Sequence, residues 1–254
     1  LIPFKMYPFQ KEMVGTFHKN RFTICKLPRQ SGKSTTMISY LLHYSLFNPS
    51  SNIAILANKA ATARDILSRL QLAYENLPKW MQQGVMSWNK GSLDLENGSR
   101  IVASSTSSSA VRGGSYNMIF LDEFAFVPHN VAEDFFSSVY PTISSGQSTK
   151  VVIVSTPNGM NLFYKLWSDA ENGRNSYNPI EVHWSEIPGR DEKWKKETIA
   201  NTSEQQFNTE FECEFLGSID TLINPSKLRT HAYKTPLQSN AGLDVYKNPE
   251  PNHT

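Results

Sequence analysis

The sequence has few cysteines, no long hydrophobic run and almost no net charge. Cys25 and Cys213 are the two cysteines, and they lack metal-ligand spacing, so we interpret them as small buried side chains of a protein from a reducing compartment. No apolar stretch approaches the length of a membrane span, which predicts no membrane partner. The formal net charge of +2 neither requires nor excludes a nucleic-acid partner, because local basic patches would suffice.

Both ends of the sequence lack the features of natural termini. Leu1 is not a methionine, no signal-peptide pattern is present after it, and the last residues, KNPEPNHT, resemble a polar linker. We therefore expect a piece of a longer protein.

A phosphate-binding loop is the most informative feature that is present. Residues 27–34 read LPRQSGKS, between a predicted strand at 21–26 and a predicted helix at 35–47. In this context backbone N–H groups and the helix dipole point at a polyphosphate. Leu27 replaces the first glycine of the usual pattern G-x-x-x-x-G-K-[ST]. We expect the nucleotide to contact Pro28, Arg29, Gln30, Ser31, Gly32, Lys33, Ser34 and Thr35.

An acidic pair, Asp122 and Glu123, comes directly after an apolar strand predicted at 116–121. Open α/β sheets bind ligands at the carboxyl ends of their strands, so this pair should lie beside the loop. Asp122 and Ser34 are then the candidate ligands of Mg²⁺, while Lys33 would contact the β- and γ-phosphates. Glu123 would be the catalytic base that polarises the attacking water. A chance G-K-S tripeptide and a solvated acidic pair are the alternatives, but both motifs in this order favour an ATPase.

A third strand, predicted at 150–154, ends in STPNG. Its hydroxyl groups could contact the γ-phosphate or the attacking water and report hydrolysis to the next segment of the chain. We predict this coupling role for Ser155, Thr156 and Asn158, and an ordinary β-turn is the alternative.

Three further residues have open assignments. Gln10 could pair with an adenine edge, or it could be a surface side chain. Arg29 could stabilise the charge of the γ-phosphate in catalysis, or it could point outward to an acid or to solvent. Arg112, in AVRGG, could act on a neighbouring subunit's nucleotide, contact a DNA phosphate or cap a loop. Four basic residues could contact phosphates, although we expect their side chains to be solvated on helix faces, namely Lys59, Arg64, Arg69 and Lys90.

The alternation of short apolar runs with amphipathic stretches predicts an α/β fold with a mostly parallel sheet flanked by helices. Further strands are expected at 52–57 and in a hairpin that turns at Asn97-Gly98, and helices at 60–74 and 161–171. Aromatic and charged residues mix after Gly173. We expect a core subdomain at 1–172, a small α+β second subdomain at 173–228 and a linker at 229–254.

The order LPRQSGKS, MIFLDE, STPNG resembles the ATPase domain of the large terminase of tailed bacteriophages, in its T-even-like branch. AVRGGSYNMIFLDEFAFVP, VVIVSTPNGMNLFYKLW and FNTEFECEFLGSIDTLI are also similar to stretches of this family. The family's loop commonly lacks the first glycine and carries an arginine, as Leu27 and Arg29 do. The resemblance implies a P-loop ATPase fold of the catalytic-glutamate type, with an additional strand, here 150–156, between the loop strand and the acidic strand.

The same resemblance implies a function and partners. The function is Mg²⁺-dependent ATP hydrolysis that powers translocation of double-stranded DNA into a viral capsid. The implied partners are the DNA, the capsid portal, the small terminase subunit and other copies of the chain in a ring, although the chain alone should be a monomer. The implied location is the cytoplasm of the infected bacterial host, docked on the prohead. Family members also carry a C-terminal nuclease domain with an acidic metal cluster, which we expect to be missing here, so we expect no nuclease activity.

Two other functions fit part of the pattern. A DNA or RNA helicase has similar phosphate chemistry, but it needs a second domain of over about a hundred residues. A nucleotide-gated binding module would hold ATP without hydrolysis, and Glu123 argues against it.

Overall fold

The computed structural model describes residues 4–107, 111, 114–145, 148–216, 238–240 and 243–245, so Arg112 lies outside the described residues. The chain groups into two compact units, Leu1–Phe215 and Leu216–Thr254. In the second unit, β9 (Gln238–Asn240) pairs antiparallel with β10 (Leu243–Val245). The predicted boundaries at 172 and 228 stay predictions.

An eight-stranded sheet organises the first unit, in the order β3-β4-β5-β2-β6-β7-β1-β8. The six strands from β5 to β8 in this order are parallel to one another, whereas β4 pairs antiparallel with both β3 and β5 at one edge. The mostly parallel α/β fold is therefore confirmed. The strands are β1 (Phe22–Lys26), β2 (Asn52–Ala57), β3 (Val85–Trp88), β4 (Ser92–Leu95), β5 (Arg100–Ser105), β6 (Met118–Asp122), β7 (Lys150–Ser155) and β8 (Asn178–Glu181).

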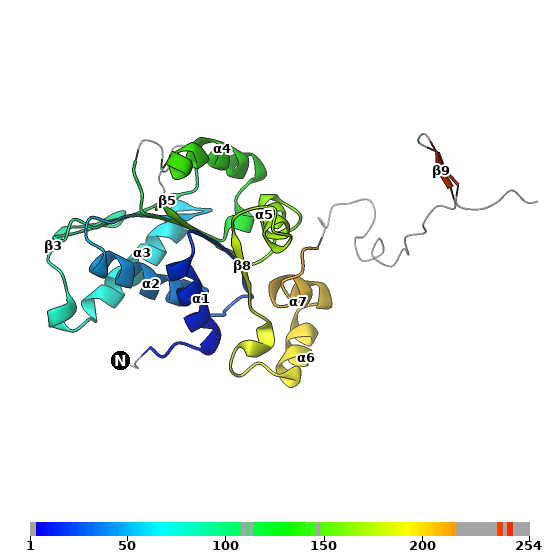
Figure 1. The fold of residues 1–254 in the computed structure, drawn as a ribbon. Helices are drawn as coiled ribbons and strands as arrows, with labels where there is room; N and C mark the ends of the chain where they lie inside the picture. Colours follow the sequence, from blue (N-terminus) through cyan, green and yellow to red (C-terminus); the bar gives the residue numbers. More distant parts are fainter. Residues whose placement is uncertain are drawn as a thin grey trace, which may run out of the picture. The chain divides into compact units, whose positions relative to one another are not determined.

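Helices cover both faces of this sheet (Figure 1). One face bears α1 (Pro8–Lys19), α2 (Lys33–Phe47) and α3 (Ala60–Glu75), and the other bears α4 (His129–Ser145) and α5 (Leu162–Glu171). Because side chains alternate along a strand, Met118 and Phe120 of β6 join the first core, while Ile119 and Leu121 join the second. Burial on both faces explains why the central strands are continuous apolar runs.

The predicted strand order around the loop is confirmed. β7 lies between β1, which leads into the phosphate loop, and β6, which ends in the acidic residue Asp122. This is the additional strand that the family resemblance implied. The hairpin at Asn97-Gly98 is present as well, and Gly98 has the left-handed φ of +83° that such a turn requires.

The segment after Gly173 contributes to the main sheet, which the sequence did not predict. β8 pairs parallel with β1 at the sheet edge. After it come the 3₁₀ helix η3 (Trp184–Glu186), α6 (Glu192–Asn201) and α7 (Glu204–Glu210). Their aromatic core contains Trp184, Trp194, Phe207 and Phe211.

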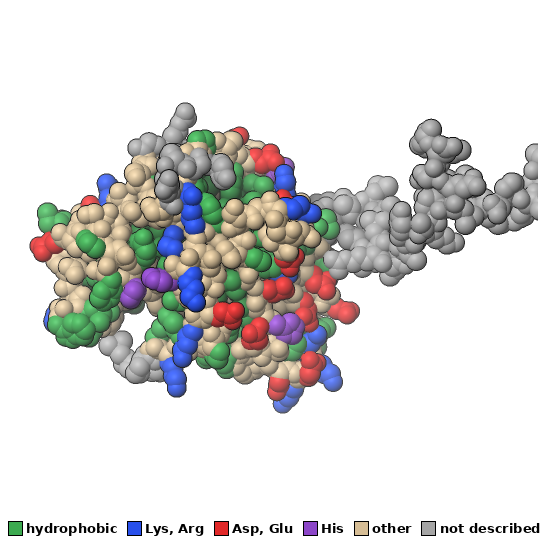
Figure 2. All heavy atoms as spheres, in the orientation of Figure 1, with side chains coloured by type: hydrophobic (Ala, Val, Ile, Leu, Met, Phe, Trp, Pro, Cys, Tyr) green, Lys and Arg blue, Asp and Glu red, His purple; other side chains and the backbone are tan. Residues whose placement is uncertain are grey.

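The surface over α6 and α7 mixes acidic and basic side chains, as Figure 2 shows in the orientation of Figure 1. Two further 3₁₀ helices complete the described elements, η1 (Lys79–Met81) and η2 (Phe124–Phe126). Among the described helices, none has the length and apolar character needed to cross a membrane.

Candidate nucleotide-binding site

The loop between β1 and α2 has the backbone of a phosphate-binding turn. Gln30 and Gly32 both have left-handed φ values, +55° and +77°, and α2 begins directly after Gly32. Helix N-termini present unpaired N–H groups and a positive dipole end, which suit an anion. The sequence therefore forms at this position the turn that its pattern predicted.

Leu27 belongs to the core and not to the phosphate-facing part of the loop. Its side chain is 0% exposed within the cluster between the sheet and α1–α3. Its N–H donates to the Ser155 carbonyl at 3.1 Å and its carbonyl accepts from the Thr156 hydroxyl at 3.1 Å. Leu27 thus continues β1 alongside β7, which gives a structural reason for the missing first glycine.

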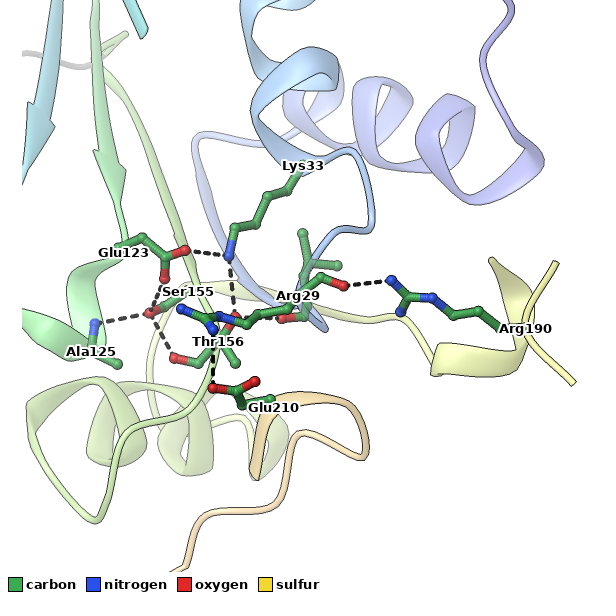
Figure 3. A network of polar contacts seen from close by, with 9 residues as sticks. Arg29, Lys33, Glu123, Ala125, Ser155, Thr156, Arg190 and Glu210 are labelled. Carbon is green, nitrogen blue, oxygen red and sulfur yellow. Dashed lines mark hydrogen bonds and ion pairs between the residues drawn. The ribbon is translucent and has the colours of Figure 1, made fainter. Parts of the chain in front are cut away.

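Lys33 joins the three sequence motifs (Figure 3). Its Nζ lies 2.5 Å from Oε1 of Glu123 and donates to the Thr156 hydroxyl at 3.1 Å. These three residues lie just beyond the carboxyl ends of β1, β6 and β7, which are adjacent in the sheet. The structure therefore brings the loop, the acidic pair and the STPNG segment to one edge of the sheet, as expected.

Asp122 is the last residue of β6, 4% exposed. Burial, with the charge of Glu123 as a second cause, raises the pKa of its carboxyl to about 7. Within the described residues its Oδ1 has no hydrogen-bond partner, and neither has the buried Oγ of Ser31 in the loop. Unpaired buried oxygens are costly, so both groups fit a site for a cation and a phosphate.

Glu123 has a left-handed backbone conformation, φ +49° and ψ +43°, which is strained for a residue other than glycine. Its Oε2 lies 3.5 Å from the Ser155 hydroxyl, and that hydroxyl accepts a hydrogen bond from the N–H of Ala125 at 3.0 Å. The strained turn directs the carboxylate toward Lys33 and Ser155 (Figure 3).

Asn158 and Asn161 connect the STPNG segment to the turn after Glu123. Both side-chain amides donate to the Ala125 carbonyl, at 3.3 Å and 2.7 Å. Asn161 also caps the N-terminus of α5. The predicted coupling residue Asn158 therefore touches the segment after the acidic pair, and Asn161 is a residue that sequence reasoning missed.

The Arg29 side chain points outward to an acidic residue, which is the second of the two arrangements that the sequence left open. Its Nη1 lies 3.1 Å from Oε1 of Glu210, at the end of α7, and its N–H donates to the Glu210 carbonyl at 3.0 Å. Arg190 donates from Nη2 to the Arg29 carbonyl at 2.8 Å. Sequence reasoning missed Arg190 and Glu210, and no local pattern marks either residue. The catalytic role of Arg29 stays a prediction.

Gln10 is buried against the phosphate loop. Its Oε1 accepts from the N–H of Tyr7 at 2.9 Å, and its Nε2 lies 2.6 Å from where a β-carbon on Gly32 would be. Only glycine fits at position 32 without displacing Gln10. The surface alternative is excluded by this burial, while the adenine contact stays a prediction.

Arg69 of α3 also reaches the loop helix. It donates to the Thr35 hydroxyl at 3.2 Å, directly after Ser34. Arg64 and Lys90, by contrast, line an open groove beside Trp88. Arg69 therefore has a contact that its default assignment as a solvated side chain did not anticipate.

Comparison with known proteins gives one matching family and a set of similar structures. The family described as "Terminase large subunit, T4likevirus-type, N-terminal" matches residues 24–230. The ATPase domain of the Thermus phage P74-26 large terminase is 22% identical, with a TM-score of 0.68 over 84% of this chain and 95% of that one. The HK97 bacteriophage large terminase is 18% identical, with a TM-score of 0.69 over 94% of this chain and 56% of that one.

The large terminase of a thermophilic bacteriophage, in complex with ADP, is 12% identical, with a TM-score of 0.65 over 83% of this chain and 54% of that one. The present chain thus spans about half the length of this protein and of the HK97 protein. Because the sequence identities are below 25%, the similar structures support only the fold. The match to the family model over residues 24–230 assigns the chain to its family.

Proposed function

We propose that this chain, which belongs to the family of N-terminal domains of T4-like terminase large subunits, is a Mg²⁺-dependent ATPase that drives double-stranded DNA into a viral capsid. One observation carries the proposal. Lys33 of the phosphate loop contacts both Glu123 after the acidic strand and Thr156 after β7. A lysine, a carboxylate and a hydroxyl at one sheet edge are the groups that phosphoryl transfer to water needs.

The loop would hold the nucleotide and the metal. The N–H groups from Ser31 to Thr35 would face the phosphates at the start of α2, where Gln10 lies close to Gly32. Ser34 and Asp122 would ligate Mg²⁺, since oxygen donors suit this ion and Asp122 has an unpaired oxygen. When bound, Mg²⁺ neutralises charge on the β- and γ-phosphates. The large terminase of the thermophilic bacteriophage forms crystalline complexes with ADP and with ATP-γ-S.

Glu123 would act as the general base. It takes a proton from the attacking water, the water oxygen bonds to the γ-phosphorus, and the bond to the bridging oxygen breaks with its electron pair going to ADP. In the observed arrangement Lys33 pairs with this carboxylate. Binding of the phosphates would draw the ammonium toward the anion and leave Glu123 free to accept the proton. The Ser155 hydroxyl, which donates to the Thr156 carbonyl at 2.8 Å in the observed arrangement, would turn to Oε2 of Glu123, 3.5 Å away, and orient the carboxylate.

Arg29 would supply donors to the γ-phosphate in the transition state, worth about 10³- to 10⁵-fold in rate for an arginine of this kind. To do so its guanidinium must leave Glu210, which lies at the end of α7. Hydrolysis would then be coupled to the segment that contains α6 and α7. Ser155, Thr156 and Asn158 would give a second route from the γ-phosphate to the turn at Ala125, which Ser155 and Asn158 contact.

The proposed partners are those of the family. They are double-stranded DNA, the capsid portal, the small terminase subunit, further copies of the chain in a ring and a C-terminal nuclease domain of the full-length protein. Arg112 would act on a neighbouring nucleotide or on DNA. The proposed location is the cytoplasm of the infected bacterial host, on the prohead. Residues 229–254 would be the linker toward the nuclease domain, and this chain alone would have no nuclease activity.

Phosphate release from ATP, with and without DNA and portal, tests the function. The variants are Glu123→Gln and Arg29→Ala, and the matched control is Glu133→Gln, an exposed carboxylate on α4. Turnover that survives in the control and is lost in the two variants supports the proposal. If wild type and Glu123→Gln are equally inactive with DNA and portal present, the chain is a nucleotide-gated module. Unwinding of a forked duplex would favour the helicase.

A further inference from the structure

We propose that Arg190 is a positioning residue of the phosphate loop. Through its hydrogen bond to the Arg29 carbonyl it would fix the peptide from which the Arg29 side chain reaches the γ-phosphate. This inference rests on the proposed ATPase function. It assigns a role in that function to a residue outside the sequence motifs.

The main chain of Arg29 is held on both sides by the segment after β8. Its N–H donates to the Glu210 carbonyl at 3.0 Å, and its carbonyl accepts from Nη2 of Arg190 at 2.8 Å. The next residue, Gln30, has a left-handed φ of +55°, a conformation that needs support from its surroundings. Two hydrogen bonds at the preceding residue provide that support.

Arg190 is itself held rigidly, which a positioning residue requires. The central carbon of its guanidinium lies 4.7 Å from the ring centre of Trp194 and 5.3 Å from that of Phe211. A planar guanidinium can stack on the rings while it donates a hydrogen bond from its edge, a geometry that a lysine ammonium lacks. Figure 3 shows the side chain extended toward the carbonyl of Arg29.

Stability alone does not account for this arginine. Its Nη1 is buried and has no hydrogen-bond partner among the described residues. An unpaired buried donor is costly, and a smaller apolar residue between the two rings would avoid the cost. The geometry therefore points to the loop contact as the reason for a guanidinium at this position.

Lys195 of α6 offers a matched control, because it lies five residues after Arg190 and packs on the same aromatic cluster. Its Nζ lies 5.3 Å from the ring centre of Trp184 and 5.1 Å from that of Phe207, and it pairs with Glu212 at 2.7 Å. Both residues are thus cations that pack on aromatic rings. Lys195 binds Glu212, however, whereas Arg190 donates to the phosphate loop. A loss of function caused only by loosening of α6 and α7 should result from removal of either cation.

The test is a double-mutant cycle in ATP hydrolysis on the whole chain. Arg190→Gln should lower kcat by about ten- to a hundredfold with little change in KM, because a small displacement of a catalytic group costs that much. In the Arg29→Ala background, Arg190→Gln should cause little further loss, since it acts through Arg29. Arg190→Lys should restore part of the rate, and Lys195→Gln should leave it near wild type.

Hydrogen exchange of the loop amides gives a readout that does not depend on activity. The amides of residues 29–31 should exchange faster in Arg190→Gln and remain unchanged in Lys195→Gln. Equal loss of kcat with and without Arg29, unchanged loop exchange, or the same effects from Lys195→Gln would each overturn the inference. If the wild type fails to hydrolyse ATP while the loop exchange responds as expected, the proposed function fails and the positioning contact stands.

Discussion

The ammonium of Lys33 lies 2.5 Å from Oε1 of Glu123, so the proposed phosphate-binding cation and the candidate base are paired with each other. The two groups come from opposite sides of β7, one after β1 and one after β6. A phosphate anion would compete with the carboxylate for this lysine. We therefore expect nucleotide binding to release the Glu123 carboxylate from Lys33.

The first prediction concerns this pair. Glu123→Gln should lower kcat by about 10²- to 10⁴-fold, because the general base is lost. It should bind ATP at least as tightly as wild type, because Lys33 no longer pairs with a carboxylate. Nucleotide affinity by calorimetry and turnover by phosphate release measure the two effects. Weaker binding by Glu123→Gln would contradict the competition between carboxylate and phosphate.

The second prediction concerns Arg29 and Glu210. Glu210→Gln keeps the main-chain contact but removes the ion pair, so the Arg29 guanidinium should be free to move. An exposed ion pair contributes up to about 1 kcal/mol, so basal kcat should rise by up to about fivefold. Arg29→Ala should bind ATP and lose nearly all turnover. Glu204→Gln, on the same helix, is the control. Normal hydrolysis by Arg29→Ala would remove Arg29 from the catalytic residues.

The third prediction is a pH dependence set by Asp122. The pKa of its carboxyl rises from 3.8 to about 7 in the folded protein, mainly through burial. Since the folded state binds this proton more tightly, the stabilising contribution is full below pH 3.8 and is lost as pH rises through about 7. Without metal, the melting temperature should therefore fall between about pH 5.5 and about pH 7.5 more in wild type than in Asp122→Asn.

The same carboxyl should make Mg²⁺ binding depend on pH. A ligand must be deprotonated to bind, so Mg²⁺ affinity should weaken by up to about tenfold for each pH unit below about 7. Titration of Mg²⁺ in the presence of ATP at several pH values measures this slope. Asp122→Asn should bind Mg²⁺ weakly at every pH, and a pH slope that persists in this variant would assign the titration to another group.

The fourth prediction concerns the missing glycine. Leu27→Gly restores the usual loop pattern but empties a fully buried position, so it should cost about 3–5 kcal/mol of stability. It should not raise kcat, because Leu27 faces the core. Leu72→Gly is the control, since Leu72 is 59% exposed and only helix propensity, about 1 kcal/mol, is lost. Chemical denaturation measures both variants, and a faster Leu27→Gly enzyme would refute the structural explanation.

Much of the fold could be predicted from the sequence because its signals are local. The strand at 52–57 has the predicted bounds, and the hairpin at Asn97-Gly98 results from turn chemistry. β7 lies between β1 and β6, as the resemblance implied. Sequence reasoning missed β8 because Asn178–Glu181 is short and contains Pro179. A proline within a short run argues against a strand of the main sheet.

The grouping of the three motifs at one end of the sheet could be predicted from local sequence patterns. Spacing within each motif specifies a strand, a turn and a helix start, and parallel strands then carry Lys33, Glu123 and Thr156 to one edge of the sheet. The positions of the Arg29 and Leu27 side chains, by contrast, depend on tertiary contacts. Their partners, Glu210, Arg190 and Ser155, are distant in the chain, and no local pattern encodes a contact made by the packing of separate elements. The outward pairing of Arg29 and the inward packing of Leu27 result from that packing.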